Sequence, residues 1–338
     1  MLDITQKLAE QTLFSGLTQE QLQAAAALWE VRQLAAEAPL WWHGDLADEL
    51  AVVLSGSLQI HINNRELGRV EHGEVVGEAA AWTGGLRTAS VCAAEPATLV
   101  VLATDRLPDL RARHPAVYDR LLHHALLGLA RRIHQVDRQI AKLAYGVGSA
   151  PGRKTPGTLS RLWQRLTNSS PSPPPARQAL RAMPALKATH ADTLATIESA
   201  LTPHHLPAGT PVFLEGDRGD SVFVVADGCI DVIRHVRGGR GERLASLFPG
   251  ALLGTGSLLL GERRNASCVA AETTACWVFE MNQATFAALS GEPGRVWRES
   301  ILEALRFQLS RADEQLTRLK SGSNPGSTDY ERIRAGLV

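Results

Sequence analysis

The sequence has few cysteines, no net charge and no long hydrophobic run. Its cysteines follow no CxxC spacing, which argues against a zinc ribbon or a disulfide framework. They are Cys92, Cys229, Cys268 and Cys276. Lysine plus arginine equals aspartate plus glutamate at 35 each, so no overall positive field would draw the chain to nucleic acid or to an anionic membrane. No apolar stretch approaches the roughly 18 residues of a membrane span, and the first residues lack a signal-peptide pattern. We therefore expect a soluble, cytoplasmic protein with reduced cysteines.

Signals for catalysis are also missing. We find no nucleophile motif, no paired acids and no cluster with metal-ligand spacing. The histidine pairs His123-His124 and His204-His205 fall on a predicted helix face and in a predicted loop, which are ordinary positions for this residue. The sequence therefore predicts a protein that is not an enzyme and holds no metal.

An internal duplication is the main positive signal. The 338 residues, of which 44% are hydrophobic, suffice for two domains. Residues 44–60 match residues 216–232 at an offset of 172, and residues 77–90 match residues 254–267 at an offset of 177. The difference of five fits a longer hairpin turn in the second copy, where insertions cost little. A repeat this long indicates a duplicated domain rather than a solenoid unit.

Both copies follow the same order of predicted elements. Each opens with a helix, preceded by Thr18 in the first copy and by Thr189 in the second, with capping-box spacing at Thr18 and Gln21. Short apolar or alternating runs between glycines, aspartates and prolines then indicate strands. A long periodic helix closes each copy, over residues 117–144 and 295–319. The pattern is typical of a mainly β protein with flanking helices, built on a barrel or a double-sheet roll.

Two motifs give this pattern a family resemblance. Each copy has an early G-D-x-x-D/E segment followed by an apolar run and a glycine, and each has an R-x-A segment ten positions after a glycine. Together they resemble the cyclic nucleotide-binding domain of cyclic-AMP-dependent kinase regulatory subunits, of catabolite activator protein and of cyclic-nucleotide-gated channels. The resemblance implies two jelly-roll-like β-barrel cyclic nucleotide-binding domains in tandem.

We expect the following domain bounds. The first domain covers residues 10–145 with its long C-terminal helix, and a basic, proline-rich linker covers 146–180. The second domain covers residues 181–320, and a flexible tail covers 321–338.

The first copy contains the site that the resemblance implies. Arg87 matches the arginine that binds the cyclic phosphate, and Glu78 matches the glutamate that accepts a hydrogen bond from the ribose 2′-hydroxyl. The backbone amides of a short helical turn would also face the phosphate. Composition alone favours a surface ion pair between Glu78 and Arg87, whereas the repeated spacing and the upstream G-D motif favour the cyclic-nucleotide site. The predicted ligand-binding set is Gly77, Glu78, Ala79, Ala80, Arg87, Thr88 and Ala89.

The second copy departs from the family pattern. Arg264 occupies the arginine position, but Thr255 replaces the glutamate. Losing a hydrogen bond to a charged group costs roughly 1.5 to 3 kcal/mol, or about 10- to 150-fold in affinity. We therefore predict a second site that binds weakly, binds another ligand or is structural only. Its candidate residues are Gly254, Thr255, Gly256, Arg264, Asn265 and Ala266.

The resemblance implies a regulatory role for the whole chain. We expect a non-catalytic receptor for cyclic AMP or cyclic GMP that changes conformation and controls an unknown effector protein; Thr88 does not decide between the two ligands, and cyclic AMP is preferred as the commoner signal. The alternative is a scaffold or dimerisation protein whose barrels no longer bind nucleotide. No helix-turn-helix follows either copy, so no DNA is expected. The first long helix could support a homodimer, and Trp82 is expected to fill the barrel.

The linker has no acidic residue between Arg138 and Ala191, although lysine and arginine recur. Within it, Leu159, Leu162, Trp163 and Leu166 repeat with helical spacing. The arginines at 161 and 165 lie on the other side, which predicts a short, basic, amphipathic helix. This helix would pack on one of the chain's own barrels, or it would contact an acidic partner or a membrane surface.

Overall fold

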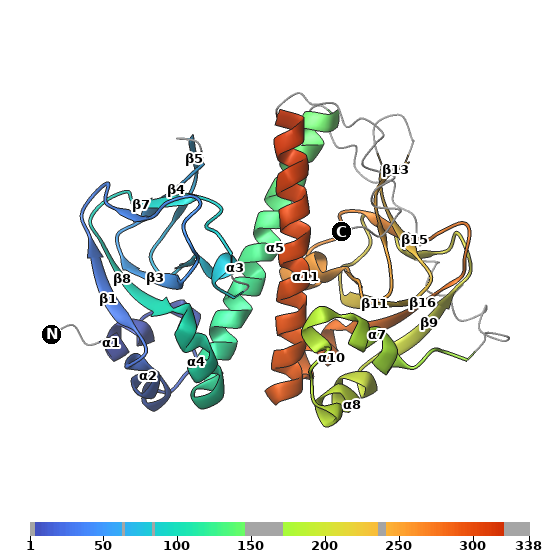
Figure 1. Ribbon diagram of the computed structural model, residues 1–338, viewed down its shortest axis with the longest axis horizontal. Coiled ribbons are helices and arrows are strands. Elements are labelled where there is room, and N and C mark those ends of the chain that lie inside the picture. The colour runs from blue at the N-terminus through green and yellow to red at the C-terminus, as the bar shows by residue number, and fades with distance from the viewer. Residues whose placement is uncertain (1–3, 63–64, 83–84, 146–171, 236–240, 321–338) are drawn as a thin grey trace. The chain divides into compact units, whose positions relative to one another are not determined.

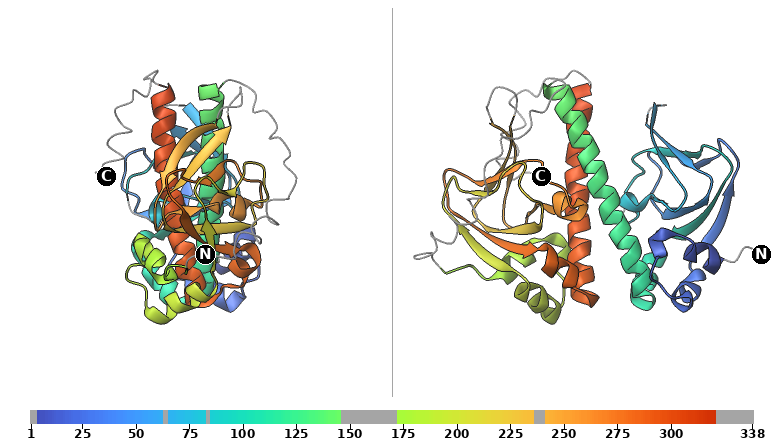
Figure 2. Two further views of the ribbon diagram at one scale, coloured as in Figure 1. Left: turned by 90° about the vertical axis from the view of Figure 1, so that its right-hand side faces the viewer. Right: turned by 180° about the vertical axis from the view of Figure 1, so that it is seen from behind.

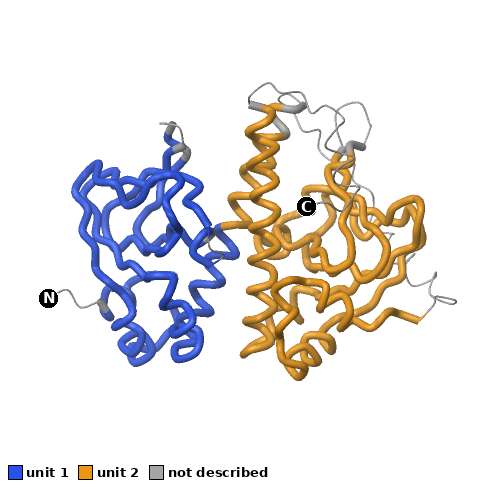
Figure 3. Tube along the Cα trace, viewed as in Figure 1, with its two compact units in different colours: residues 1–128 blue, residues 129–338 orange. Residues whose placement is uncertain are grey.

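The chain folds into two compact units, residues 1–128 and residues 129–338 (Figure 3). The computed structural model describes residues 4–62, 65–82, 85–145, 172–235 and 241–320. Within these ranges each unit has eight strands in two four-stranded antiparallel sheets. Helices gather at one end of each pair of sheets (Figure 1). The predicted class, mainly β with flanking helices and two jelly-roll-like domains in tandem, is confirmed.

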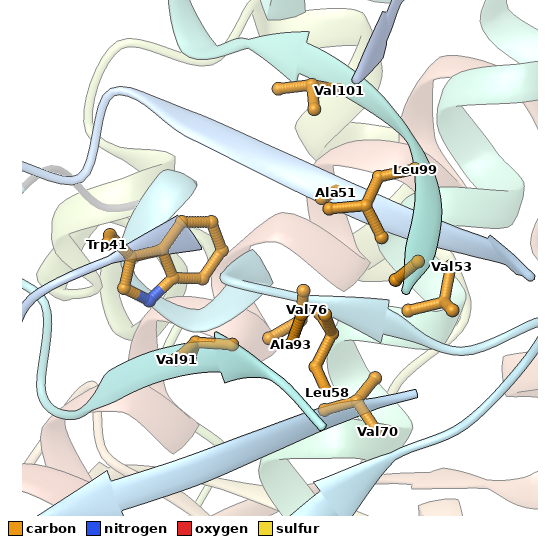
Figure 4. Packing of buried hydrophobic residues seen from close by; sticks show 11 residues of the cluster. Trp41, Ala51, Val53, Leu58, Val70, Val76, Val91, Ala93, Leu99 and Val101 are labelled. Atoms are coloured by element: carbon orange, nitrogen blue, oxygen red, sulfur yellow. The ribbon is translucent and has the colours of Figure 1, made fainter. Parts of the chain in front are cut away.

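The sheets of the first unit enclose its core. Their strand orders are β1-β8-β3-β6 and β2-β7-β4-β5. The strands are β1 Glu30–Leu34, β2 Pro39–Trp41, β3 Glu49–Ser55, β4 Leu58–Ile62, β5 Arg65–Val70, β6 Val75–Val76, β7 Ser90–Ala93 and β8 Ala97–Ala103. Side chains from both sheets, among them Val53, Leu58 and Leu99, form one buried cluster, and Trp41 lies at one end of it (Figure 4). Alternation of inward and outward residues along such strands explains why β-branched side chains dominate this core.

The second unit repeats this topology strand for strand. Its sheet orders are β9-β16-β11-β14 and β10-β15-β12-β13. The strands are β9 Thr202–Leu206, β10 Pro211–Phe213, β11 Ser221–Asp227, β12 Ile230–His235, β13 Gly241–Leu247, β14 Leu252–Leu253, β15 Ser267–Ala270 and β16 Cys276–Asn282. The duplication inferred from the sequence is therefore a duplication of the fold.

The extra residues of the second copy lie in one hairpin, as predicted. Leu58 pairs with Val70 across β4 and β5, and Ile230 pairs with Leu247 across β12 and β13. These pairs correspond in the two copies, so the additional residues fall between them. A hairpin lengthens outward without changing the register at its base.

The helices flank the sheets and connect the units. The first unit contains α1 Ile4–Ala9, α2 Gln19–Ala26, α3 Glu78–Ala81, α4 Leu107–Arg113 and the start of α5 Pro115–Tyr145. The second contains α7 Ala176–Ala182, α8 Ala191–Ser199, α9 Thr255–Leu260, α10 Gln283–Ala288 and α11 Gly291–Lys320. Short 3₁₀ turns cover Thr12–Phe14, Thr104–Arg106 and Pro184–Leu186. Both predicted long helices are present.

Two helix starts show where local signals succeed and fail. Thr18 and Gln21 form the predicted capping box of α2, in which each side chain bonds the backbone of the other. The start predicted at Thr189 is wrong by one residue, because the side chain of His190 caps α8 by accepting from the amide of Asp192. Histidine is an uncommon cap, and the more usual threonine stands next to it.

Helix α5 passes from the first unit into the second. Its second half packs alongside α11 within the second unit, as Figure 2 also shows. The contact buries Val136, Ile140, Leu309, Ala312 and Leu316. The predicted linker helix falls in residues 146–171 and the predicted tail in 321–338, both of which lie outside the described residues.

All four cysteines are free thiols. Burial raises the pKa of each of them, and it raises that of Cys268 to about 12. Among the described residues, no group of acids, cysteines and histidines has a metal-binding arrangement. Within the same ranges, none of the helices combines the length and the apolar character that crossing a membrane requires.

Candidate functional site

The first site begins at a glycine turn. We call residues 77–90 cassette 1 and residues 254–267 cassette 2. Gly77 precedes α3 with a φ of 84°, a left-handed conformation that glycine adopts without strain. A Cβ atom at this position would lie 2.7 Å from Nη1 of Arg87 and 2.7 Å from the Trp41 ring. The glycine therefore lets the first turn of α3 approach the Arg87 guanidinium.

Arg87 is buried inside the first unit. Only 3% of its surface is exposed, and its guanidinium carbon lies 3.7 Å from the centre of the Trp41 ring. Its Nη2 donates to the backbone oxygen of Glu49 at 2.8 Å. The carboxylate of Glu49 is already bound by both terminal nitrogens of Arg32, at 2.6 and 2.9 Å. The remaining acid, Asp48, is 3.7 Å away and 80% exposed.

Two nitrogens of this guanidinium, Nε and Nη1, are buried without a hydrogen-bond partner. Burial lowers the pKa of Arg87, although the acids at 45, 48 and 49 oppose the shift. A buried cation with unsatisfied donors is costly unless an anion pairs with it. Nη1 faces the first turn of α3, whose leading N–H groups, including those of Ala79 and Ala80, have no acceptor within the helix. Donors from two elements thus converge on a place suited to a phosphate.

Glu78 lies on the other side of the same turn, against α5. A Cβ atom on Gly128 would come within 2.8 Å of Oε1 of Glu78, so the helix passes close to this carboxylate. The indole N–H of Trp82 donates to the hydroxyl of Tyr118 at 3.0 Å, and the two rings pack 5.7 Å apart. Trp82, which we expected inside the barrel, is instead half-buried between α3 and α5. The contacts join cassette 1 to the first half of α5.

We expect the substitution Gly128→Ala to weaken nucleotide binding about threefold to tenfold without lowering the unfolding temperature. The added methyl group displaces only the end of the flexible Glu78 side chain, and alanine favours the helix by about 1 kcal/mol. Calorimetric titration and thermal unfolding measure the two effects. In a chain that already carries Glu78→Gln, the same substitution should have no further effect on affinity. An unchanged affinity in the single variant would contradict a role for Glu78.

Cassette 2 has the same framework but a different arginine environment. Arg264 is also buried and lies over the Phe213 ring at 4.2 Å. Its Nη2 donates to the backbone oxygen of Ser221 at 2.7 Å. Its Nη1 donates to the Gly254 oxygen at 2.9 Å and to the Ser257 hydroxyl at 2.8 Å. Burial lowers the pKa of Arg264, yet the terminal nitrogens are satisfied by the protein itself.

One of the two acceptors of Nη1 in cassette 2 comes from a residue that differs between the cassettes. Ser257 stands where cassette 1 has Ala80, and alanine has no acceptor for the arginine. In cassette 1 Nη1 has no hydrogen-bond partner, whereas in cassette 2 it binds both the serine hydroxyl and the backbone oxygen of Gly254. Thr255, the replacement for the glutamate, is buried at 2% exposure. In cassette 2, position 257 therefore holds a serine that contacts the arginine, and position 255 holds a buried threonine instead of a glutamate.

The structure gathers most predicted site residues around the two arginines. Ala89 and Ala266 each follow the arginine by two positions, and both are buried. Gly256 belongs to the first turn of α9. Thr88 and Asn265 follow the arginines at exposed positions. Asn265 contacts Asp137 of α5 through a hydrogen bond of 3.1 Å.

Sequence reasoning missed the aromatic partners of both arginines. Trp41 and Phe213 end β2 and β10, which pair with β7 and β15 directly after the arginine segments. A detectable signal existed, because an aromatic residue precedes each G-D motif by three positions. Tyr118 and Gly128 were also missed, since nothing local ties a long helix to a turn some 40 residues earlier.

Comparisons with known proteins give the family. The cyclic nucleotide-binding domain family matches residues 31–114 and 203–290, together more than half of the chain. A curated relative, cyclic AMP receptor protein of Thermus thermophilus, is 44% identical over 68 residues, which is 20% of this chain and 32% of the relative. The match thus spans about a third of that relative's length.

Solved structures with a similar fold include the regulatory domain of Toxoplasma gondii PKA with cAMP. It is 18% identical, with 87% of this chain and 93% of that chain covered and a TM-score of 0.31. A cyclic nucleotide-binding domain from Methylobacillus flagellatus is 25% identical, covering 44% of this chain and 85% of its own, with a TM-score of 0.36. On the strength of the two family matches, one in each half, the chain belongs to the cyclic nucleotide-binding domain family.

Proposed function

We propose that this protein is a non-catalytic receptor that binds one cyclic nucleotide per chain, at cassette 1. The observation that supports this most directly is the buried Arg87, whose Nε and Nη1 both lack hydrogen-bond partners. A cyclic phosphate carries one negative charge and several acceptor oxygens, which suits both nitrogens and the first turn of α3. Gly77, Glu78, Ala79, Ala80, Arg87, Thr88 and Ala89 are the proposed binding residues.

The ligand is proposed to act through α5. Glu78 and Trp82 both meet the first half of this helix, so a nucleotide that reorients the cassette also changes the surface on which α5 rests. A ligand shifts such an equilibrium only by its differential affinity for the two arrangements, typically about 1 to 3 kcal/mol. The readout would reach a cytoplasmic effector protein through the second domain and the linker.

Cassette 2 is proposed not to bind cyclic nucleotide under the conditions that fill cassette 1. The backbone framework of the site is kept, but Ser257 accepts from Nη1 of Arg264, and Thr255 stands where a glutamate would bind the ribose. The residues of this site are Gly254, Thr255, Gly256, Arg264, Asn265 and Ala266. We retain residues 10–145 and 181–320 as the two domains, joined by the basic linker.

Calorimetric titration with cyclic AMP and, separately, cyclic GMP tests the proposal. We expect micromolar or tighter binding close to one site per chain, with the lower dissociation constant identifying the preferred ligand. The matched control is Arg264→Ala, which removes the second arginine and should leave the stoichiometry unchanged. No heat with either nucleotide, together with an unchanged melting temperature, would favour the alternative of a scaffold without a ligand.

A further inference from the structure

The second half of α5 meets cassette 2 through polar side chains within the second unit. Asp137 accepts from the side-chain amide of Asn265 at 3.1 Å and lies 3.7 Å from the guanidinium of Arg234. One turn earlier, Nδ1 of His134 is 3.2 Å from a carboxylate oxygen of Glu262. Burial raises the pKa of the Asp137 carboxyl, although Arg234 opposes the rise. The helix thus contacts residues on both sides of Arg264 in the sequence.

Apolar residues of α5 cover the same place. Ala130 and Ile133 face Gly256 and Ser257 of α9 across a cavity of about 30 Å³. This volume has room for about one water molecule, whereas ligand pockets measure roughly 300 to 1,000 Å³. With the helix in this position, the space between α5 and these residues of cassette 2 is too small for a nucleotide.

The same segment of α5 also packs against α11. Val136 and Ile140 pack on α11 in the buried cluster described above, and Arg132 lies 3.3 Å from the carboxylate of Asp313. One side of the α5 segment is therefore fixed to α11 while another contacts cassette 2. A surface that combines a buried apolar cluster with polar contacts beside it is typical of a specific interface.

We propose that cassette 2 is the docking site of the chain's own helix α5, with residues 130–137 in place of a nucleotide. Ser257 supports this assignment, because it accepts from Nη1 of Arg264 in the absence of an anion, although Nε of Arg264 has no partner. The first half of α5 contacts Glu78 and Trp82 of cassette 1, so the same helix serves both cassettes. A ligand in cassette 1 then alters the docking at cassette 2, a step that rests on the proposed function.

Thiol labelling of the full chain tests the docking. The substitution Ala130→Cys places a reactive group at a position that is 2% exposed beside the cavity, which leaves room for the sulfur. Peptide mass spectrometry separates its labelling from that of the native cysteines. We expect slow labelling, accelerated about twofold to tenfold by Asn265→Ala combined with Glu262→Gln, because each of these exposed contacts contributes up to about a factor of five.

The matched control is Ala125→Cys, at a fully buried position in the first half of the same helix. Its labelling should not respond to the two cassette 2 substitutions. Hydrogen exchange of the peptide covering residues 130–140, in chains without an added cysteine, should rise with Asn265→Ala and Glu262→Gln. This second measurement keeps the test valid if Ala130→Cys disturbs the fold.

The outcomes separate docking, coupling and nucleotide binding. Labelling at position 130 that is as fast as for an exposed thiol, or that ignores the cassette 2 substitutions, would overturn the docking. Saturating cyclic AMP that changes the labelling rate supports the coupling. If calorimetry shows binding but the rate stays constant, the coupling is wrong and the receptor function stands. If calorimetry shows no binding while the substitutions still accelerate labelling, the function fails and the docking stands.

Discussion

Replacing Arg87 with alanine should weaken cyclic-nucleotide binding by about two to four orders of magnitude. Nε and Nη1 are the buried donors without a partner, and each would form a charge-assisted hydrogen bond worth roughly 1.5 to 3 kcal/mol. Calorimetric titration, or competition against a labelled nucleotide when affinity becomes low, measures the loss. Arg87→Lys should recover only part of the affinity, because a single ammonium cannot reproduce the planar fork.

A stability measurement separates this loss from misfolding. Arg87→Met keeps most of the side-chain volume over Trp41 but removes a buried charge whose ion pair, with the 80% exposed carboxylate of Asp48, spans 3.7 Å. Its unfolding temperature without nucleotide should therefore be no lower than that of the natural chain. Wild-type affinity in Arg87→Ala, with the fold intact, would remove the basis of the proposed function.

A single hydroxyl group should convert cassette 1 into the closed form of cassette 2. In Ala80→Ser the new oxygen would stand where Ser257 accepts from Arg264, so it would occupy Nη1 of Arg87. The nucleotide would then lose one charge-assisted bond, and we expect its affinity to fall by about 10- to 150-fold. The reverse change, Ser257→Ala, adds no group to cassette 1 and should not produce a loss of this size there.

Ala80→Cys is the steric control for this experiment. Sulfur is larger than oxygen but is a weak hydrogen-bond acceptor. If the arginine contact is responsible, serine should reduce affinity more than cysteine does. A cysteine variant that is equally weak or weaker would mean that crowding, and not occupation of Arg87, explains the loss.

The fold was predictable because its signals are local and occur twice. Glycines and aspartates mark the turns, alternating apolar residues mark the strands, and the two copies confirm each other even where a hairpin is longer. The paired bases of those hairpins, Leu58 with Val70 and Ile230 with Leu247, fall where the repeat predicts. The domain bounds and the roles of individual binding residues stay predictions.

The interior of the site was less predictable because it depends on contacts between distant segments. Trp41 reaches Arg87 only through the pairing of β2 with β7. The occupation of Arg264 by Ser257 needs the folded turn, although both residues were within a recognised motif. The position of α5 beside α11 could not be read from the amphipathic pattern, which indicates that a helix has an apolar face but does not name the surface that covers it.

The raised pKa values of the four thiols affect how the protein reacts with oxidants. Because burial raises the pKa of each, including that of Cys268 to about 12, very little thiolate is present near neutral pH. The thiolate is the form that reacts with peroxides and disulfides, so these side chains are chemically quiet. We therefore expect these thiols to react with oxidants more slowly than exposed cysteines with an ordinary pKa.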